Sequence, residues 1–357
     1  MEEAVLKFKL KPCDVLYFGS GKTLRIAQAV KSVFPPCPHT VAGAICSKLN
    51  SLNINKPLKK LFGPFLYNEK EKKFYFPKPA DIYKLRKKET VEACFYVKPI
   101  KRNFSLFSLE NINKPEGIEL IALYQGAEEI EPFDGFISEN GLFKWIKGEK
   151  IIKEDVKQFQ EVFEYEPRLG IRQEITTHTV AGKDSVYRVS FVRIKEEWSF
   201  VVFVEFKDNI KEEVLKFFQT PPFIFKFGGE MKIIKYEMEN KNIKEEKIFK
   251  EIERAKIGDI KEVKILYLTP GVYEKFPPLN EIEGVEIKGV LIPRWLNLSI
   301  SSKKLGKINL VKKAFLPGTV LYGEVKDLEK FKRLWLNPSD GSNNFIGSNL
   351  IIYTKIE

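Results

Sequence analysis

The sequence predicts an α+β protein with two domains, and three observations carry this prediction. The length of 357 residues suits two domains of about 150 to 200 residues each. A composition of 43% hydrophobic and 13% aromatic residues is enough to build sizeable cores. Strand-like and helix-like segments also alternate in the order strand, helix, strand, strand, helix, strand. That order is the ferredoxin-like split βαβ arrangement.

The first elements follow from hydrophobic periodicity. Apolar residues alternate with lysines over 6–10, which predicts a half-buried strand, and a second apolar run follows at 15–18. Apolar residues at helical spacing over 24–34 predict a helix that ends at Pro35. A second helix is predicted from Thr40 to about residue 49.

The middle of the chain is predicted to decorate and extend the core. Pro-rich aromatic stretches reach about residue 81, and the breaks that follow as far as 150 indicate insertions. Two core strands, 170–175 and 186–194, are predicted to form a long hairpin with a polar tip at 176–185. A strand at 199–206, a helix at 208–218 and a strand at 223–227 complete the first unit.

The C-terminal part is predicted to form a second unit. A Lys/Glu-dense helix and linker over 238–261 precede it. The predicted domains are 1–235 and 236–357. Within the second, strands are predicted at 263–268, 285–292, 308–315, 320–325 and 350–356, with a helix at 328–335.

Charge points to a polyanionic partner. The 60 Lys+Arg and 48 Asp+Glu give a formal net charge of +12, which suits nucleic acid or an acidic membrane surface. Most lysine is balanced by glutamate, whereas four of the ten arginines fall in the predicted hairpin: Arg168, Arg172, Arg188 and Arg193. With basic and aromatic groups near its tip, this hairpin could hold a single strand. The alternative is a solvated hairpin with internal ion pairs to Glu166 and Glu174.

Three loops could approach a phosphate. Gly19 to Thr23 (GSGKT) resembles part of a P-loop, but the full pattern needs glycine where Leu16 stands. A flexible basic turn is therefore the favoured interpretation. The Gly228-Gly229 segment suits either a phosphate nest or a tight turn. The Gly-, Ser- and Asn-rich loop at 339–349 has the same two interpretations.

Catalytic and metal motifs are lacking in the sequence. His39 and His178 are the only imidazoles, and neither has a Ser or Cys partner in a recognised arrangement. The four cysteines are scattered, which predicts a reducing compartment and no disulfide framework. The N-terminus lacks the pattern of a secretory leader, and no apolar run approaches bilayer length, so a cytoplasmic location is expected. An RNase using one His and a basic residue stays open.

Short motifs recur along nearly the whole chain, and their order makes them specific together. They are 12–18 (PCDVLYF), 34–44 (FPPCPHTVAGA), 62–66 (FGPFL), 139–143 (ENGLF), 166–171 (EPRLGI) with 186–188 (VYR), 227–230 (FGGE), 268–271 (LTPG), Trp295, Lys312-Lys313 and 316–322 (LPGTVLY). Together they resemble the repeat-associated mysterious protein (RAMP) superfamily of CRISPR systems. The specific resemblance is to the subunit near the crRNA 5′ end in type III-B (Cmr) effector complexes.

The resemblance implies two ferredoxin-like (RRM-like) domains with insertions and a projecting β-hairpin. It also implies a noncatalytic subunit that holds the crRNA 5′ tag without a cofactor or metal. The implied protein partners are the large polymerase-like subunit and the neighbouring backbone RAMP subunit. The alternatives are a RAMP-type crRNA-processing endoribonuclease and a P-loop-like nucleotide hydrolase.

Residues matched to the motifs, together with those of the basic hairpin and loops, form the candidate RNA-binding set. Two departures weaken the assignment in the second domain: Ile292-Pro293-Arg294 stands where the family tends to have glycines, and the last loop has only Gly341 and Gly347. The candidate RNA contacts are Lys22, Arg25, Arg168, Arg172, His178, Lys183, Tyr187, Arg188, Arg193, Gly228, Gly229, Lys232, Trp295, Lys312, Lys313, Asn343, Asn344 and Gly347.

Overall fold

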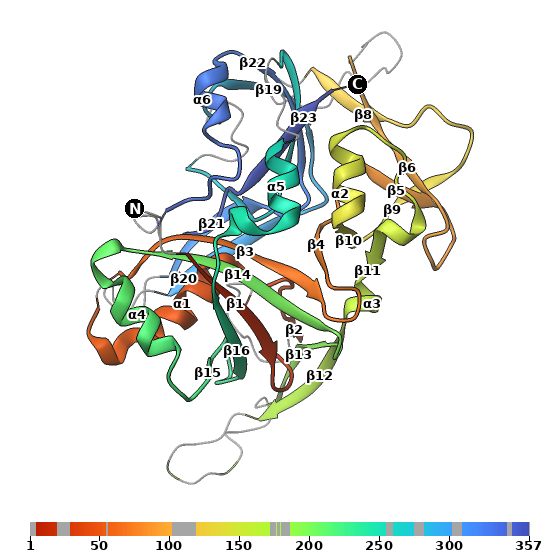
Figure 1. Cartoon of the computed structure of the whole chain (residues 1–357). Helices are drawn as coiled ribbons and strands as arrows, with labels where there is room; N and C mark the ends of the chain where they lie inside the picture. Colours follow the sequence, from red (N-terminus) through yellow and green to blue (C-terminus); the bar gives the residue numbers. More distant parts are fainter. Residues whose placement is uncertain are drawn as a thin grey trace.

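The chain folds into a mixed α+β structure dominated by β-sheets (Figure 1). The fold comes from a computed structural model, and the description covers part of the chain. The described residues are 5–19, 29–54, 56–101, 119–171, 176, 179, 186–254, 260–274, 282–301, 309–340 and 345–356.

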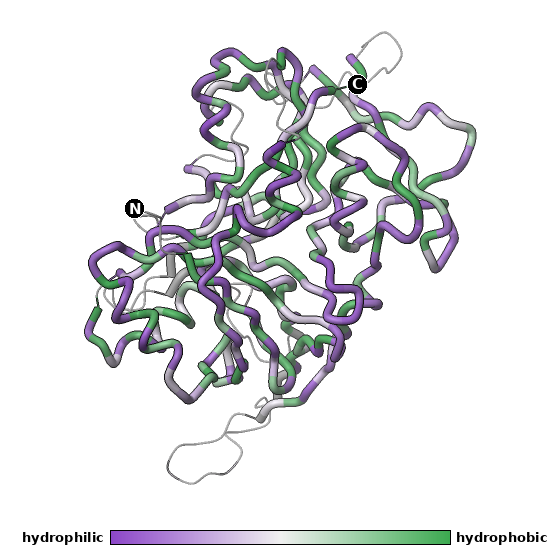
Figure 2. Tube along the Cα trace, viewed as in Figure 1, coloured by the Kyte–Doolittle hydropathy of each residue, from purple (hydrophilic) through white to green (hydrophobic). Residues whose placement is uncertain are grey.

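An eight-stranded antiparallel sheet forms the centre of the first half. Hydrophobic residues recur along its strands (Figure 2). In spatial order its strands are β11 (Val156–Gln158), β10 (Gly135–Ser138), β4 (Lys73–Pro77), β3 (Leu58–Asn68), β14 (Trp198–Phe206), β1 (Val5–Pro12), β16 (Ile233–Asn240) and β15 (Ile224–Lys226).

Strand β14 is the middle of this sheet because both of its faces are apolar. All of its residues are buried, and it pairs with β1 on one side and β3 on the other. Val202 contributes to the core beneath α1 (Pro38–Leu49) and α4 (Lys211–Phe218). Phe203 contributes to the opposite core, beneath α2 (Glu139–Ile146) and α5 (Lys247–Arg254). β-branched and aromatic residues suit such a doubly covered strand.

Several predicted elements of the first half are confirmed. In β1, Leu6, Phe8 and Leu10 are buried, whereas the intervening lysines are partly exposed. Helix α1 begins at Pro38, close to the predicted Thr40, and its predicted inward face is buried. The predicted strand at 199–206 is β14. The predicted helix at 208–218 consists of a 3-10 turn at 208–210 followed by α4.

The predicted helix over 24–34 is wrong in its described part. Residues 29–31 form strand β2 (Ala29–Lys31), which pairs in parallel with β13 (Val186–Ile194). Residues 20–28 lie outside the described part of the chain. Pairing with a distant strand overrides local helical periodicity here.

The long hairpin is real, but its strands are not core strands of the central sheet. Strand β12 (Phe163–Ile171) pairs with β13, and β2 completes a separate three-stranded sheet. In the central sheet, the strand next to β14 opposite β1 is β3, which lies within the stretch predicted only as Pro-rich and aromatic. Residues 172–175 and most of the predicted tip lie outside the described ranges.

The prediction of a helix and linker over 238–261 is also wrong at its start. Residues up to Asn240 complete β16, and only Lys247–Arg254 form α5. Inward and outward side chains alternate along β16, so its charge density reflects one exposed face.

The second half is built mainly of two sheets. The predicted strands and helix of this region are confirmed within a few residues. The first sheet has the order β19 (Val285–Leu291), β22 (Val320–Val325), β17 (Glu262–Tyr267), β23 (Ile351–Lys355), and the second has the order β18 (Gly271–Val272), β21 (Asn309–Phe315), β20 (Trp295–Ser301). Helix α6 (Leu328–Lys332) precedes β23.

The predicted insertions at 81–150 contain short strands. Strands β5 (Ile82–Leu85), β6 (Cys94–Tyr96) and β9 (Ile130–Pro132) form one small sheet, and β7 (Lys98–Lys101) pairs with β8 (Leu120–Leu123). A short helix, α3 (Phe159–Val162), leads into β12.

The two halves share one apolar core. Phe65 and Phe249 from the first half belong to the same cluster of buried residues as Leu266 and Tyr353 from the second. The elements around this shared core are therefore held in one arrangement by packing.

Candidate nucleic-acid interface

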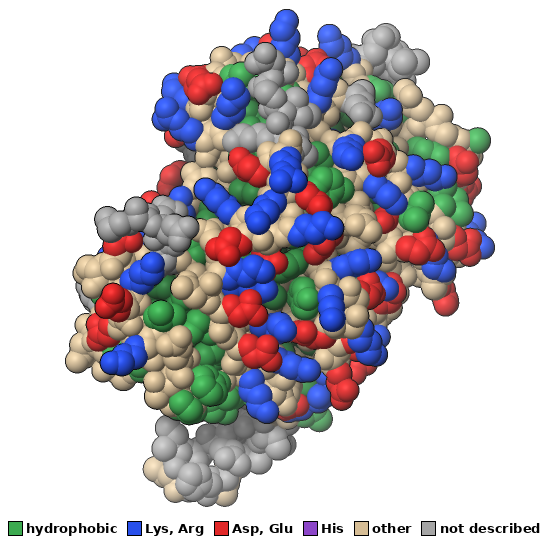
Figure 3. Space-filling view, viewed as in Figure 1, with side chains coloured by type: hydrophobic (Ala, Val, Ile, Leu, Met, Phe, Trp, Pro, Cys, Tyr) green, Lys and Arg blue, Asp and Glu red, His purple; other side chains and the backbone are tan. Residues whose placement is uncertain are grey.

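Lysine and glutamate form ion pairs on the open face of the central sheet, which is the part of the face around β1 and β16 that α2 and α5 leave uncovered. Lys7 Nζ lies 2.6 Å from Glu246 Oε1, and Lys9 Nζ lies 3.2 Å from Glu69 Oε2 and 3.4 Å from Glu237 Oε2. Figure 3 shows the resulting mixture of basic and acidic side chains. This confirms that glutamate balances much of the lysine, so the +12 does not by itself locate a polyanion site.

Two candidate arginines converge at the base of the hairpin. Arg168 lies on β12 and Arg193 on β13, and both donate to Glu166. The Nε of Arg168 is 2.7 Å from Glu166 Oε1, and the Nε of Arg193 is 2.6 Å from Glu166 Oε2. Antiparallel pairing makes this possible because it sets Glu166 opposite Phe191, two residues from Arg193.

A third cation and a second acid complete this hairpin-base cluster, defined as Asp14, Glu166, Arg168, Arg193 and Lys232. Asp14 Oδ1 lies 3.2 Å from Arg193 Nη2, and Asp14 Oδ2 lies 3.6 Å from Arg168 Nη2 and 3.9 Å from Lys232 Nζ. Three cations against two carboxylates leave a local charge of +1. The predicted internal ion pair to Glu166 is therefore confirmed, but it does not neutralise the cluster.

The acids of the cluster are held in their charged form. Hydrogen bonds from Arg168 and then Arg193 lower the pKa of Glu166. The backbone amide of Val15, followed by the charges of Arg168 and Arg193, lowers the pKa of Asp14. About two fifths of each arginine side chain is exposed, at 39% and 41%. Both guanidinium groups are thus pre-oriented and still reachable by an anion.

The glycine turn positions Lys232 beside the hairpin. Gly228 has φ +75°, and a Cβ there would lie 2.4 Å from the carbonyl oxygen of Tyr17. The amide of Gly229 donates to that same carbonyl at 2.8 Å. The close approach predicted for this turn is therefore made to the chain itself. It brings Lys232 Nζ to 5.0 Å from the ring centre of Phe191, whose ring Arg168 also covers at 5.3 Å.

Arg188 stands apart from this cluster. It lies on β13 opposite Leu169 and next to Ala29 of β2, and it is exposed. In the part of the chain that the structure describes, it has no acidic partner. Among the described hairpin arginines 168, 188 and 193, Arg188 is thus the most available to a phosphate. The backbone of Tyr187 belongs to β13, while Arg172, His178 and Lys183 lie outside the described residues.

The candidates of the second half are on other elements. Lys312 and Lys313 lie on β21, opposite Leu298 and Asn297 of β20, and Trp295 begins β20. Lys312 forms an ion pair with Glu274. Lys22, Arg25, Asn343 and Asn344 lie outside the described residues.

Gly347 has an internal role. It is buried with φ +80°, and a Cβ there would lie 2.6 Å from Cβ of Pro38 at the start of α1. Its amide donates to Ser339 O at 2.9 Å, and its carbonyl accepts from Thr269 Oγ1 at 2.8 Å. Both of its backbone groups are therefore used within the chain.

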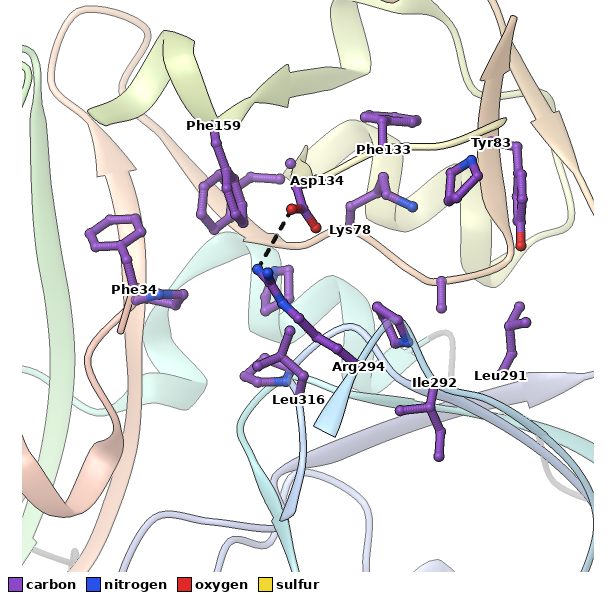
Figure 4. Close-up of a pocket in the computed structure, with 18 residues that line it drawn as sticks. Phe34, Lys78, Tyr83, Phe133, Asp134, Phe159, Leu291, Ile292, Arg294 and Leu316 are labelled. Carbon is purple, nitrogen blue, oxygen red and sulfur yellow. Dashed lines mark ion pairs between the residues drawn. The ribbon is translucent and has the colours of Figure 1, made fainter. Parts of the chain in front are cut away.

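A pocket of about 380 Å³ lies between the two halves. Its walls are aromatic rings and prolines, and Figure 4 shows Phe34, Phe133 and Phe159 around it. Arg294, from the loop before β20, reaches across to Asp134, which precedes β10; Arg294 Nη2 lies 3.5 Å from Asp134 Oδ2. Such walls can hold a flat ring, and the guanidinium at the rim can hold its anionic substituent.

Buried charge adjoins this pocket. Lys78 is buried, and its Nζ donates to the carbonyls of Pro79 at 2.9 Å and Ile82 at 2.6 Å. Burial lowers its pKa to about 8. Burial also raises the pKa of Tyr165 on β12, and Arg294 and Asp134 both act on that hydroxyl electrostatically. The charged rim of the pocket is therefore close to the base of the hairpin.

Sequence reasoning missed the pocket residues. Phe34 ends the helix predicted over 24–34, Asp134 lies in the predicted insertions and Phe159 lies outside the predicted elements, so only folding brings them together. One signal pointed this way: Ile292-Pro293-Arg294 departs from the family pattern, and all three residues line the pocket.

The described residues hold neither a metal-binding cluster nor a bilayer-spanning helix. Within the described ranges, no three His, Cys, Asp or Glu side chains gather in a way that suits a metal ion. None of the helices in those ranges has the length and apolarity of a bilayer-spanning segment.

Comparison with known proteins gives consistent matches. The family model described as "CRISPR-associated protein (Cas_Cmr3)" matches residues 8–356. A chain in the cryo-EM structure of the Type III-B Cmr-beta bound to cognate target RNA and AMPPnP, state 1, is 17% identical with a TM-score of 0.50, and the match covers 88% of this chain and 86% of that chain. A chain in the corresponding structure bound to cognate target RNA is 16% identical, with the same TM-score and coverage. No curated protein matches.

Proposed function

The chain belongs to the Cas_Cmr3 family of CRISPR-associated proteins, and from this premise we propose that it is a noncatalytic subunit that holds the 5′ tag of a crRNA. The sequence resemblance to a type III-B RAMP subunit is confirmed at the level of the family. The chain is a type III-B CRISPR effector subunit. The proposal concerns its role within such a complex.

The hairpin base is the observation that carries this proposal. Arg168 and Arg193 are held by Glu166 with their guanidinium groups partly exposed, and Arg188 lies exposed on the same hairpin. Planar, fixed guanidinium groups suit bidentate contacts to phosphate. Side chains alternate between the two faces of a strand, so a single strand crossing one face of the hairpin base would meet Arg168, Arg193 and Lys232. Arg188, opposite Leu169, lies on the other face and would meet RNA there.

The pocket between the halves adds stacking surface to this proposal. Single-stranded RNA is bound by a basic path together with aromatic rings on which bases stack. The rings of Phe34, Phe133 and Phe159 supply such surfaces beside β12, and Arg294 supplies a cation at the rim. We infer that the tag runs from the hairpin base toward this pocket.

We also propose that the chain consists of two ferredoxin-like units. Four neighbouring strands of the central sheet lie in the spatial order β3, β14, β1, β16. If these four are numbered 1 to 4 along the chain, the spatial order is 2-3-1-4, which is that of the ferredoxin-like arrangement. Strands β19, β22, β17 and β23 have the same order. The predicted boundary at Lys235 falls inside β16, so the first unit extends to Asn240.

The proposed partners are those that the family resemblance implies. They are the crRNA, the large polymerase-like subunit and the neighbouring backbone RAMP subunit. Membership of a family of effector subunits supports assembly with other proteins and RNA.

A noncatalytic role agrees with the state of His39. This histidine is partly buried at the start of α1, with its ring 5.6 Å from that of Phe345, and burial lowers its pKa to about 4. The imidazole is therefore neutral at pH 7. The enzyme alternatives rest on His178 and Lys22, which lie outside the described residues. Cleavage of repeat RNA that is lost in His178→Ala, or ATP hydrolysis lost in Lys22→Ala, would contradict a noncatalytic role.

RNA binding by the purified chain tests the proposal. Arg168→Glu with Arg188→Glu should weaken binding of tag-bearing RNA steeply at low salt, because two phosphate contacts become repulsive. The matched control is Arg333→Glu, an exposed arginine just after α6. If the double variant binds the tag as tightly as the control, the hairpin does not hold RNA.

A further inference from the structure

Exposed apolar side chains gather at the β15–β16 edge of the central sheet. Eight large apolar side chains in the described residues are exposed, and four of them lie within this one hairpin. They are Phe223 at 45%, Ile224 at 38%, Met231 at 71% and Ile233 at 44% exposure. Figure 3 shows the hydrophobic patch at the lower edge of the molecule. Apolar side chains exposed singly are common on protein surfaces, whereas a cluster of them typically marks an interaction surface.

Three lysines lie on the same face of the sheet as Ile224 and Ile233. Lys11 of β1 is opposite Lys235 of β16, Lys235 is opposite Ile224, and Ile233 is opposite Lys226. All three lysines are exposed, and none has an acidic partner in the described part of the chain. Lys7 and Lys9, earlier on β1, are both paired with glutamates. The open face of the sheet is thus neutralised over one part and left cationic and apolar at its edge.

The backbone at this edge is partly protected. β15 is the last strand of the sheet, so the backbone N–H and C=O groups of alternate residues point toward β16 or outward from the edge. Lys48 of α1 donates to the carbonyls of Pro222 at 2.8 Å and Ile224 at 3.1 Å. A lysine in this position discourages the addition of a further strand. Recognition here would therefore depend on the side chains of the open face.

We propose that this β15–β16 surface docks an acidic, amphipathic segment of another protein subunit. Its apolar side chains would cover Ile224, Ile233 and the adjoining turn residue Met231, and its carboxylates would pair with Lys11, Lys226 and Lys235. RNA fits less well, because bases stack on flat rings, whereas the exposed carbon here is mostly aliphatic. The inference rests on the assembly role proposed above and adds to it a surface and the chemistry of the partner.

Site-specific photocrosslinking in the assembled complex tests this inference. A photoreactive amino acid at position 233 of the chain, expressed together with the other effector subunits and crRNA, should crosslink to a peptide of another subunit that carries Asp or Glu among apolar residues. Position 152 is the matched control, because Ile152 has nearly the same exposure, 43%, away from this hairpin. A crosslink from position 233 to crRNA, or to no protein in an intact complex, would overturn the inference.

Variants separate the apolar and the charged contributions. Ile224→Ser with Ile233→Ser, and separately Lys235→Gln with Lys226→Gln, should each reduce the partner subunit recovered per chain by about tenfold. The controls Ile152→Ser and Lys150→Gln should leave recovery unchanged. Loss of RNA in the lysine variant, with no effect of the isoleucine variant, would identify RNA as the occupant and overturn the inference.

Two measurements keep the outcome clear. Met231→Ser changes a turn residue that is 71% exposed, so it should reduce partner recovery even if changes within the strands destabilise the sheet. If the wild-type chain carries no other subunit at all, the assembly role itself fails. If the complex assembles with its RNA and yet all β15–β16 variants recover the partner fully, only the docking surface is wrong.

Discussion

Arg188 offers the sharpest single-residue prediction, because it is exposed and has no acidic partner in the described part of the chain. Arg188→Gln should remove one cation without releasing a buried acid, so the fold should be unaffected. One lost phosphate contact on a single strand should reduce the slope of log affinity against log salt by about 0.7. At low salt the affinity should fall by about 1 to 2 kcal/mol, which is about 5- to 30-fold.

The assay is titration of labelled tag RNA at several salt concentrations. Arg333→Gln, at the end of α6, is the matched control and should leave both slope and affinity unchanged. If Arg188→Gln keeps the wild-type slope while Arg333→Gln lowers it, then RNA crosses a different face of the molecule. Equal slopes in all three proteins would likewise refute the role given to the hairpin.

Three further predictions concern the cluster, the glycine turn and the buried lysine. Arg168→Ala should weaken RNA binding, because it lowers the net charge of the hairpin-base cluster from +1 to zero. Adding Glu166→Gln returns this charge to +1 and should restore most of the lost affinity. A double variant that binds no better than Arg168→Ala would refute the charge balance. Gly228→Ala should destabilise the fold by about 2 kcal/mol in thermal unfolding, because its φ is +75° and the added Cβ would clash with the carbonyl oxygen of Tyr17. The control is Gly43→Ala in α1, which has open space at its Cβ and should be neutral or stabilising. Lys78 has a folded pKa of about 8, below its ordinary value of 10.5, so the unfolded chain binds more protons between these values and stability should rise with pH there. Relative to Lys78→Met, the wild-type protein should gain about 2 kcal/mol between pH 7 and 9.5 in denaturant titrations, and a constant difference would show that Lys78 does not titrate as described.

The sequence was sufficient to predict a strand or helix where only one face of the element meets the core. Leu6, Phe8 and Leu10 alternate in β1, and Val214 and Phe218 lie one helical turn apart in α4, so local pattern and burial agree. β16 carries the same alternation, with Ile234 and Tyr236 inward, but its outward Lys and Glu resembled a charged helix. β3 was hidden because Gly63 and Pro64 interrupt a strand that continues through an irregular pairing with β14.

The candidate site could be predicted only in part. The concentration of arginine located the hairpin and named Glu166 as an ion-pair partner, but only the strand register shows that Glu166 lies between Arg168 and Arg193. Asp14 lies far from both arginines in the sequence and had no local signal. Likewise, the helix predicted over 24–34 gave way to β2, because pairing with β13 is a long-range interaction. The Phe34 and Arg294 pocket has no local signal beyond the departure at Ile292-Pro293-Arg294.

Crosslinking from the 5′ tag itself tests the central proposal most directly. A crRNA with a photoreactive nucleotide in its 5′ tag, assembled into the complete effector complex, should crosslink to this chain, and peptide mapping should place the crosslink on β12, β13 or the Phe34 and Arg294 pocket. Crosslinks that reach only other subunits, while this chain is present in the complex, would contradict the account.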